Sequence, residues 1–166
     1  MTTKDAATRA VVFSSATDDW PTPRYLFDAL DAEFGFVLDV CASRRNRKAA
    51  SWYGLDHPVR SRRDGLAGDW AADAARAGGA VWMNPPYGRG IGAWMAKART
   101  AAESGATVVC LVPARTDTAW FHDSVLAAGA EVRYLRGRVK FGDAAHGAPF
   151  ASLVVVFRPW AARAAS

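Results

Sequence analysis

The feature that most constrains the fold is an alternation of short apolar runs with helix-like segments along the chain. The apolar runs cover residues 36–41, 81–83, 107–112, 131–135 and 152–157, with a weaker one at 50–55. Segments with the spacing or composition of helices cover residues 24–34, 69–77, 92–104 and 118–128. Several runs are apolar on both faces, which is typical of strands buried in a parallel sheet. This order predicts one α/β domain with a mostly parallel, doubly wound sheet.

The ends of these segments sharpen the prediction. The apolar spacing of the first helix ends at Gly35, and Thr22 is placed to cap this helix, with Pro23 at its first position. The last two strands, 131–135 and 152–157, are joined by a stretch without a helical pattern. We therefore expect these two strands to pair antiparallel at one edge of the sheet.

The length of 166 residues suits a single domain, which we place at residues 18–158. Residues 1–17 are expected to be a flexible N-terminus and residues 159–166 a C-terminal tail. No apolar run reaches the roughly 20 residues that cross a bilayer, and the first residues lack the apolar core of a signal peptide. Cys41 and Cys110 show no metal-site spacing and read as buried reduced thiols, which favours a cytoplasmic protein without a bound metal.

The basic residues occur in clusters and give the chain a formal net charge of +5. The clusters lie at 44–48, 60–63 and 133–140. Such a balance suits a polyanionic partner, although a merely solvated basic surface is an equally good interpretation of charge alone.

The stretch VWMNPPYGRG (residues 81–90) has the clearest chemistry in the chain. Two prolines fix the backbone after a strand, where doubly wound sheets bind ligands, and Pro85 pushes Asn84 towards an extended conformation. The Asn84 amide oxygen and a proline carbonyl would then form two neighbouring acceptors, and Tyr87 a flat face. This set suits a planar group that carries an exocyclic amine. A rigid turn, with Asn84 as a cap and Tyr87 as packing, is the structural alternative.

Asn-Pro-Pro-Tyr after a strand resembles the catalytic motif of S-adenosylmethionine-dependent amino methyltransferases, and the resemblance extends along the chain. The further motifs are W-x-T-P (from Trp20), L-D-V-C-A (38–42), N-x-K (Asn46, Lys48), D-G-L with a later Trp70, L-V-P-A-R-T-D-T-x-W-F-H (111–122) and G-R-V-x-F (137–141). In this order they resemble the small phage and prophage DNA N-6-adenine methyltransferase (Dam) family over residues 18–158. The resemblance implies a single Rossmann-like methyltransferase domain with an antiparallel edge.

The resemblance also implies roles for individual residues. The catalytic residues would be Asn84, Pro85, Pro86 and Tyr87. Oxygens of Asn84 and a proline would accept hydrogen bonds from the N6 amine of an adenine flipped out of DNA, and the Tyr87 ring would stack on the base. S-adenosylmethionine would contact Trp20, Thr22, Pro23, Asp39, Cys41, Ala42, Asn46, Asp64 and Asn84. DNA, single- or double-stranded, would contact Arg115, Arg136, Arg138 and Lys140.

Several of these assignments have alternatives. Asp39 lies at the end of a strand, where its carboxylate can bind the ammonium or the ribose of a nucleoside-amino acid. The alternative is that Asp39 caps the next helix. The stretch after it, Ala42-Ser43-Arg44, departs from the glycine-rich form of related methyltransferases. Asp69 competes with Asp64 for the cofactor adenine, and Asp56 is a candidate for the ribose hydroxyls.

The motif leaves other functions open. Cytosine N4, an RNA base or a protein glutamine would fit the same acceptors, and a catalytically silent nucleic-acid-binding module would need only the arginines. The length leaves little room for a separate target-recognition domain, so we expect loose or very short sequence specificity. The sequence does not indicate an oligomeric state.

Overall fold

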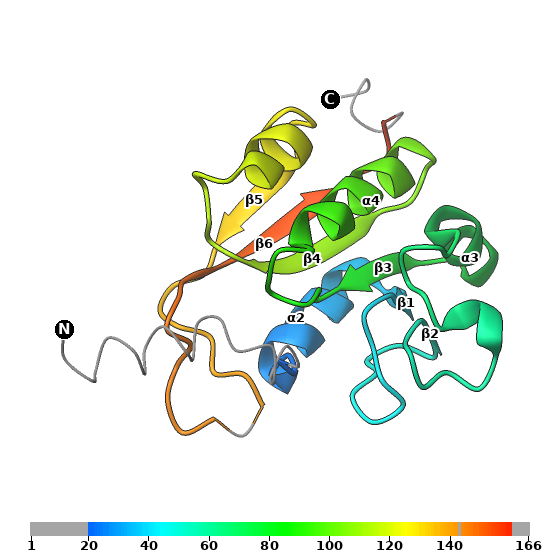
Figure 1. The fold of residues 1–166 in the computed structure, drawn as a ribbon, viewed down its shortest axis with the longest axis horizontal. Helices are drawn as coiled ribbons and strands as arrows, with labels where there is room; N and C mark the ends of the chain where they lie inside the picture. The colour runs from blue at the N-terminus through cyan, green and yellow to red at the C-terminus, as the bar shows by residue number, and fades with distance from the viewer. Residues whose placement is uncertain (1–19, 143, 161–166) are drawn as a thin grey trace.

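The computed structural model describes residues 20–142 and 144–160. Its centre is a six-stranded sheet in the order β2-β1-β3-β4-β6-β5 (Figure 1). The strands are β1 (Phe36–Asp39), β2 (Ser51–Trp52), β3 (Ala80–Met83), β4 (Val108–Pro113), β5 (Glu131–Tyr134) and β6 (Ser152–Phe157). The first four pair in parallel, and β6 runs antiparallel to both β4 and β5. The predicted antiparallel pairing is confirmed, and the reversed strand lies one place inside the edge.

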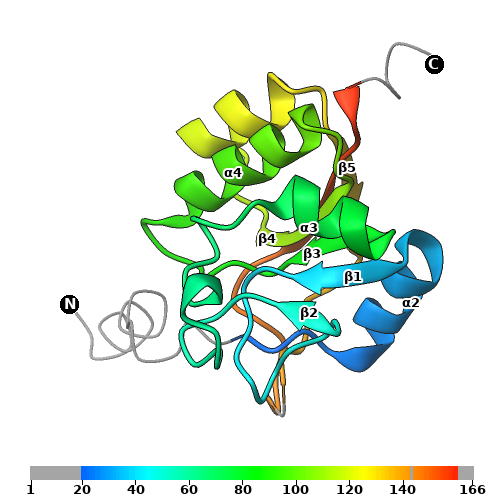
Figure 2. The ribbon, with the colours of Figure 1, turned by 90° about the vertical axis from the view of Figure 1, so that its right-hand side faces the viewer.

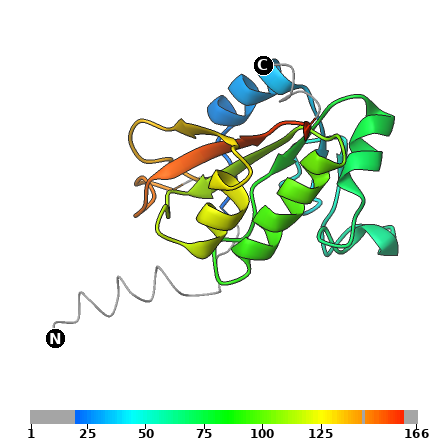
Figure 3. The same cartoon turned by 90° about the horizontal axis from the view of Figure 1, so that it is seen from above.

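Helices cover both faces of the sheet. Helix α2 (Arg24–Phe34) lies on one face, and α3 (Trp70–Ala77), α4 (Ile91–Glu103) and η2 (Phe121–Leu126) lie on the other (Figures 2 and 3). A short 3-10 turn, η1 (Arg60–Arg62), precedes α3. The sheet is therefore covered on two sides, as the sequence predicts.

The central strands are buried on both faces because their alternate side chains enter different cores. In β4, Val108, Cys110 and Val112 pack with the core under α3 and α4. Val109 and Leu111 pack with the core under α2. This two-sided burial explains why the run TVVCLV has no polar alternation.

Three local predictions need correction. Thr22 does not cap α2, whose N-cap is Pro23 without a side-chain hydrogen bond, because the Thr22 hydroxyl accepts from Asn84 instead. The first strand ends at Asp39, where a loop begins, and does not extend to residue 41. The predicted helix at 118–128 has its regular part at Phe121–Leu126, with π-type hydrogen bonding.

The predicted flexible N-terminus at 1–17 lies outside the described residues, as do residues 161–166 of the predicted tail. Within the described residues, no helix has the length and apolar character needed to span a membrane.

Candidate active site

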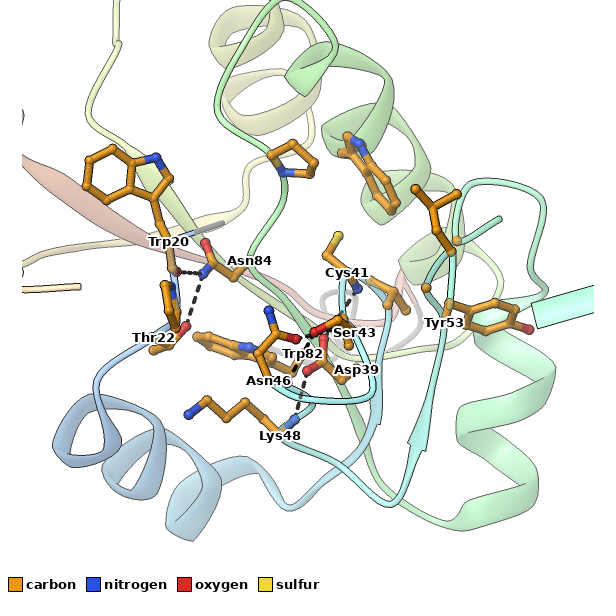
Figure 4. A pocket seen from close by; sticks show the side chains of 18 of the residues that line it. Trp20, Thr22, Asp39, Cys41, Ser43, Asn46, Lys48, Tyr53, Trp82 and Asn84 are labelled. Atoms are coloured by element: carbon orange, nitrogen blue, oxygen red, sulfur yellow. Dashed lines mark hydrogen bonds between the residues drawn. The ribbon is translucent and has the colours of Figure 1, made fainter. Parts of the chain in front are cut away.

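A cavity of about 580 Å³ opens where β1, β2 and β3 end (Figure 4). This volume lies in the usual range for small-molecule and cofactor sites. Its walls come from several short parts of the chain between residues 20 and 94. They include residues 20–22, the loop 39–48 after β1, residues 53–55 after β2, residues 63–65, and Trp82, Asn84, Pro86 and Trp94.

The carboxylate of Asp39 organises the loop at the bottom of this cavity. Its side chain is only 3% exposed. One carboxylate oxygen accepts from the Cys41 amide at 3.3 Å, and the other accepts from the Lys48 amide at 2.9 Å. Burial outweighs these contacts and raises the pKa of Asp39 to about 6. Asp39 therefore changes charge in a mildly acidic range.

The loop that follows β1 is closed by further local bonds. The Asn46 side-chain oxygen accepts from the Ser43 amide at 2.6 Å, and the Ser43 hydroxyl accepts from the Asn46 amide at 3.2 Å. Both carboxylate oxygens of Asp56 accept from the Arg44 amide. Ser43 and Asn46 line the cavity, whereas Asp56 braces the loop from outside the lining residues.

Asn84 follows β3, and its side-chain amide lies next to Trp20 and Thr22 (Figure 4). Its amide nitrogen donates to the Trp20 carbonyl at 2.6 Å and to the Thr22 hydroxyl at 3.1 Å. A carbonyl oxygen only accepts, so the nitrogen must face Trp20 and the oxygen must face the other way. That oxygen, Oδ1, is buried, and no group of the described residues donates to it. A buried acceptor without a donor is uncommon in proteins, so Asn84 Oδ1 can accept a hydrogen bond from a ligand that reaches it.

The rest of the motif surrounds Asn84. Pro85 is buried, and the exposed Pro86 lines the cavity. The Tyr87 hydroxyl donates to the Leu111 carbonyl at 3.2 Å, and burial raises its pKa. Its ring contacts Phe150 edge-on, with the ring centroids 5.5 Å apart. Tyr87 therefore lies beside the cavity rather than among its lining residues.

The two carboxylates that compete for the cofactor adenine have different surroundings. Asp64 is exposed and lines the cavity, with one oxygen accepting from the Leu66 amide at 2.9 Å. Asp69 is the N-cap of α3 and accepts from the Ala72 amide at 3.0 Å. Among the other predicted cofactor residues, Trp20, Thr22, Cys41 and Ala42 also line the cavity, and Pro23 does not.

The predicted DNA-contacting residues follow the C-terminal ends of strands that finish on the same side of the sheet as the cavity. Arg115 follows β4, and Arg136, Arg138 and Lys140 follow β5. Strands β4 and β5 run in the same direction, because both are antiparallel to β6. All four side chains are exposed.

Residue types that the motifs alone did not assign also build the cavity. Lys48 belongs to the quoted N-x-K motif, so a positive charge near Asp39 could have been anticipated. Gly65 belongs to the quoted D-G-L motif, whereas Gly54 belongs to none of the quoted motifs, and the reason that both must be glycine arises only in three dimensions. A Cβ on Gly54 would overlap the Ala42 carbonyl, and one on Gly65 would overlap the Val40 carbonyl. Both glycines let the walls approach closely.

A family model described as DNA N-6-adenine-methyltransferase (Dam) matches residues 10–166. The chain belongs to this family. Membership in the Dam family implies an enzyme that methylates adenine N6 in DNA with S-adenosylmethionine, which confirms the activity predicted from the motifs. No curated protein gives a significant match. Within the described part of the chain, no group of three or more His, Cys, Asp or Glu side chains could hold a metal ion.

Proposed function

We propose that this Dam-family enzyme has a Rossmann-like methyltransferase fold in which the cavity binds S-adenosylmethionine and the motif from Asn84 to Tyr87 holds the adenine. The observation that carries this proposal is Asn84, a residue that lines the cavity and whose Oδ1 atom is buried without a donor among the described residues. An exocyclic amine supplies the missing donor. The strand order supports the fold, since three parallel strands end at one cavity.

The cavity residues fit the cofactor. S-adenosylmethionine carries an ammonium and a sulfonium, and the buried Asp39 carboxylate offers the matching negative charge. Asp64, next to Gly65 on the cavity wall, offers an acceptor for an adenine amine. The proposed contacts are completed by the other lining residues Trp20, Thr22, Cys41, Ala42 and Asn46. Pro23 follows Thr22 and does not line the cavity.

When bound, S-adenosylmethionine supplies an electrophilic methyl group. Adenine N6 is a poor nucleophile, because its lone pair is delocalised into the ring. In our assignment, the two N–H groups of that amine donate to Asn84 Oδ1 and to the Pro85 carbonyl oxygen. Accepting both draws the nitrogen towards tetrahedral geometry and stabilises the positive charge that develops there. Holding the amine in place supplies proximity, and a proton leaves to solvent after transfer.

Access to N6 requires the base to leave the duplex stack. The flipped base would enter next to Pro86, and Tyr87 would support it from the side. Arg115, Arg136, Arg138 and Lys140 would hold the flanking phosphates.

Removing two positive charges from the segment that follows β5 is expected to weaken DNA binding in a salt-dependent way. The double variant Arg138→Ala/Lys140→Ala should lower the slope of log affinity against log salt by about 2, because each cation releases about one counterion. A fluorescence anisotropy titration at several salt concentrations measures this slope. The matched control is Arg99→Ala/Arg158→Ala, which removes the same charge from helix α4 and from the residue that follows β6. Equal slopes for both variants would contradict the assignment.

The proposed activity is tested with labelled S-adenosylmethionine and unmethylated DNA, single- and double-stranded, followed by digestion to nucleosides. We expect N6-methyladenine at many or very short sites. Label in N4-methylcytosine would show that cytosine, and not adenine, is the target base. No transfer of label although DNA binding is retained would reject the proposal.

We further propose that residues 18–158 are the catalytic domain, that the protein is encoded by a phage or prophage, and that it acts in the bacterial cytoplasm, where host DNA lies.

A further inference from the structure

The segment before α2 contacts the proposed catalytic motif at the Asn84 side chain. Both N–H groups of the Asn84 amide are occupied, one by the Trp20 carbonyl at 2.6 Å and one by the Thr22 hydroxyl at 3.1 Å. Because two fixed acceptors hold one planar amide, its oxygen has only one direction left. Thr22 is 4% exposed, so this contact lies at a buried residue.

We propose that Thr22 and the Trp20 carbonyl form a clasp that aims Asn84 Oδ1 at the target amine, so that Thr22 is a positioning residue for methyl transfer and not only a wall of the cofactor cavity. This inference rests on the proposed function, in which Asn84 Oδ1 accepts from the amine. It also explains why a threonine placed to cap α2 makes no capping bond.

The clasp is fastened by the segment that carries the basic residues after β5. The Trp20 ring packs edge-on against Phe141 and Phe150, with centroid separations of 5.3 and 5.7 Å. The Gly142 amide donates to the Pro21 carbonyl at 2.9 Å. The Trp20 backbone is therefore held from the side where DNA is proposed to bind, and the Asn84 amide is held by that backbone.

The test compares Thr22→Val with Thr22→Ser. Valine keeps the shape but leaves one Asn84 N–H buried without an acceptor, whereas serine keeps the hydroxyl. We expect the single-turnover rate of methyl transfer at saturating cofactor to fall on the order of tenfold in Thr22→Val, and to stay within about threefold of wild type in Thr22→Ser. The cofactor Kd, measured by calorimetry, should rise by a smaller factor than the transfer rate falls in Thr22→Val.

A second readout does not depend on activity. The Asn84 side-chain amide protons are identified in a nitrogen-15 spectrum by their loss in Asn84→Ala. We expect slow hydrogen exchange of these protons in wild type and Thr22→Ser, and fast exchange in Thr22→Val.

Three results would overturn the clasp: equal rates in wild type and Thr22→Val, unchanged exchange in Thr22→Val, or a cofactor Kd that rises as much as the rate falls. The last result would make Thr22 a cofactor contact alone. If Asn84→Ala is inactive while Thr22→Val is fully active, the clasp fails and the proposed function stands. If Asn84→Ala keeps full activity, the proposed role of Asn84 fails, and the exchange readout still decides whether the clasp exists.

Discussion

Replacing Asn84 with alanine is expected to lower methyl transfer about 100- to 1000-fold while S-adenosylmethionine binding is retained. The alanine removes the buried Oδ1 acceptor of a residue that lines the cavity, so the amine loses the group that stabilises its developing charge. Single-turnover transfer to DNA and calorimetry with the cofactor measure the two effects separately. Full transfer by the variant would reject the proposed role of Asn84.

An aspartate at this position provides an informative comparison. It offers the amine an oxygen in the same place, but its second oxygen would face the Trp20 carbonyl, where Nδ2 now lies at 2.6 Å. Two acceptors in contact repel each other, and the buried charge has no cation among its present contacts. We therefore expect Asn84→Asp to be nearly as inactive as Asn84→Ala. High activity of this variant would show that the amide nitrogen is dispensable.

Replacing Asp39 with asparagine is expected to weaken S-adenosylmethionine binding and to remove its dependence on pH. Burial raises the pKa of Asp39 to about 6, so the carboxyl is mostly neutral at pH 5 and mostly charged at pH 7. The cofactor is a cation overall and prefers the charged form. Its affinity for the wild type should therefore rise about tenfold from pH 5 to pH 7, and the variant should stay at the weaker value. Calorimetry across this range gives both curves.

The same pKa predicts the stability of the protein without cofactor, with the opposite sign. The unfolded carboxyl loses its proton near its usual pKa of 3.8, whereas the folded one keeps it until about 6. The free energy of unfolding should therefore fall as the pH rises from about 4 to about 6, by up to about 3 kcal/mol. Asp39→Asn should lack this fall. A wild-type stability that rises or stays level over this interval, after subtraction of the variant's curve, would contradict the assignment.

The elements with local determinants could be predicted from the sequence. Helix α2 and strand β6 have the predicted bounds, because Gly35 takes a left-handed conformation after the helix and the β6 run is apolar throughout. The motif also placed Asn84 at the end of a strand. These features depend on neighbours in the chain, so the sequence pattern contains them.

The details of the site depend on contacts between distant segments, and the sequence could not supply them. Thr22 has the pattern of a helix cap, and only its contact with a residue 62 positions away reassigns it. Asp64 and Asp69 are equivalent by composition, and the path of one loop decides which of them faces the cavity. The end of β1 is set by Asp39, whose carboxylate draws the amides of Cys41 and Lys48 towards it.

The place of β6 in the sheet has a consequence for how the enzyme is made. Strand β6 is the last strand along the described chain, yet it lies between β4 and β5, and all six of its residues are buried. During synthesis, β4 is left with an unpaired edge until residues 152–157 have emerged from the ribosome, and β5 has no neighbour to pair with. The sheet is therefore completed only after β6 has been made, and a nascent chain that stops before β6 exposes the unpaired apolar edge of β4.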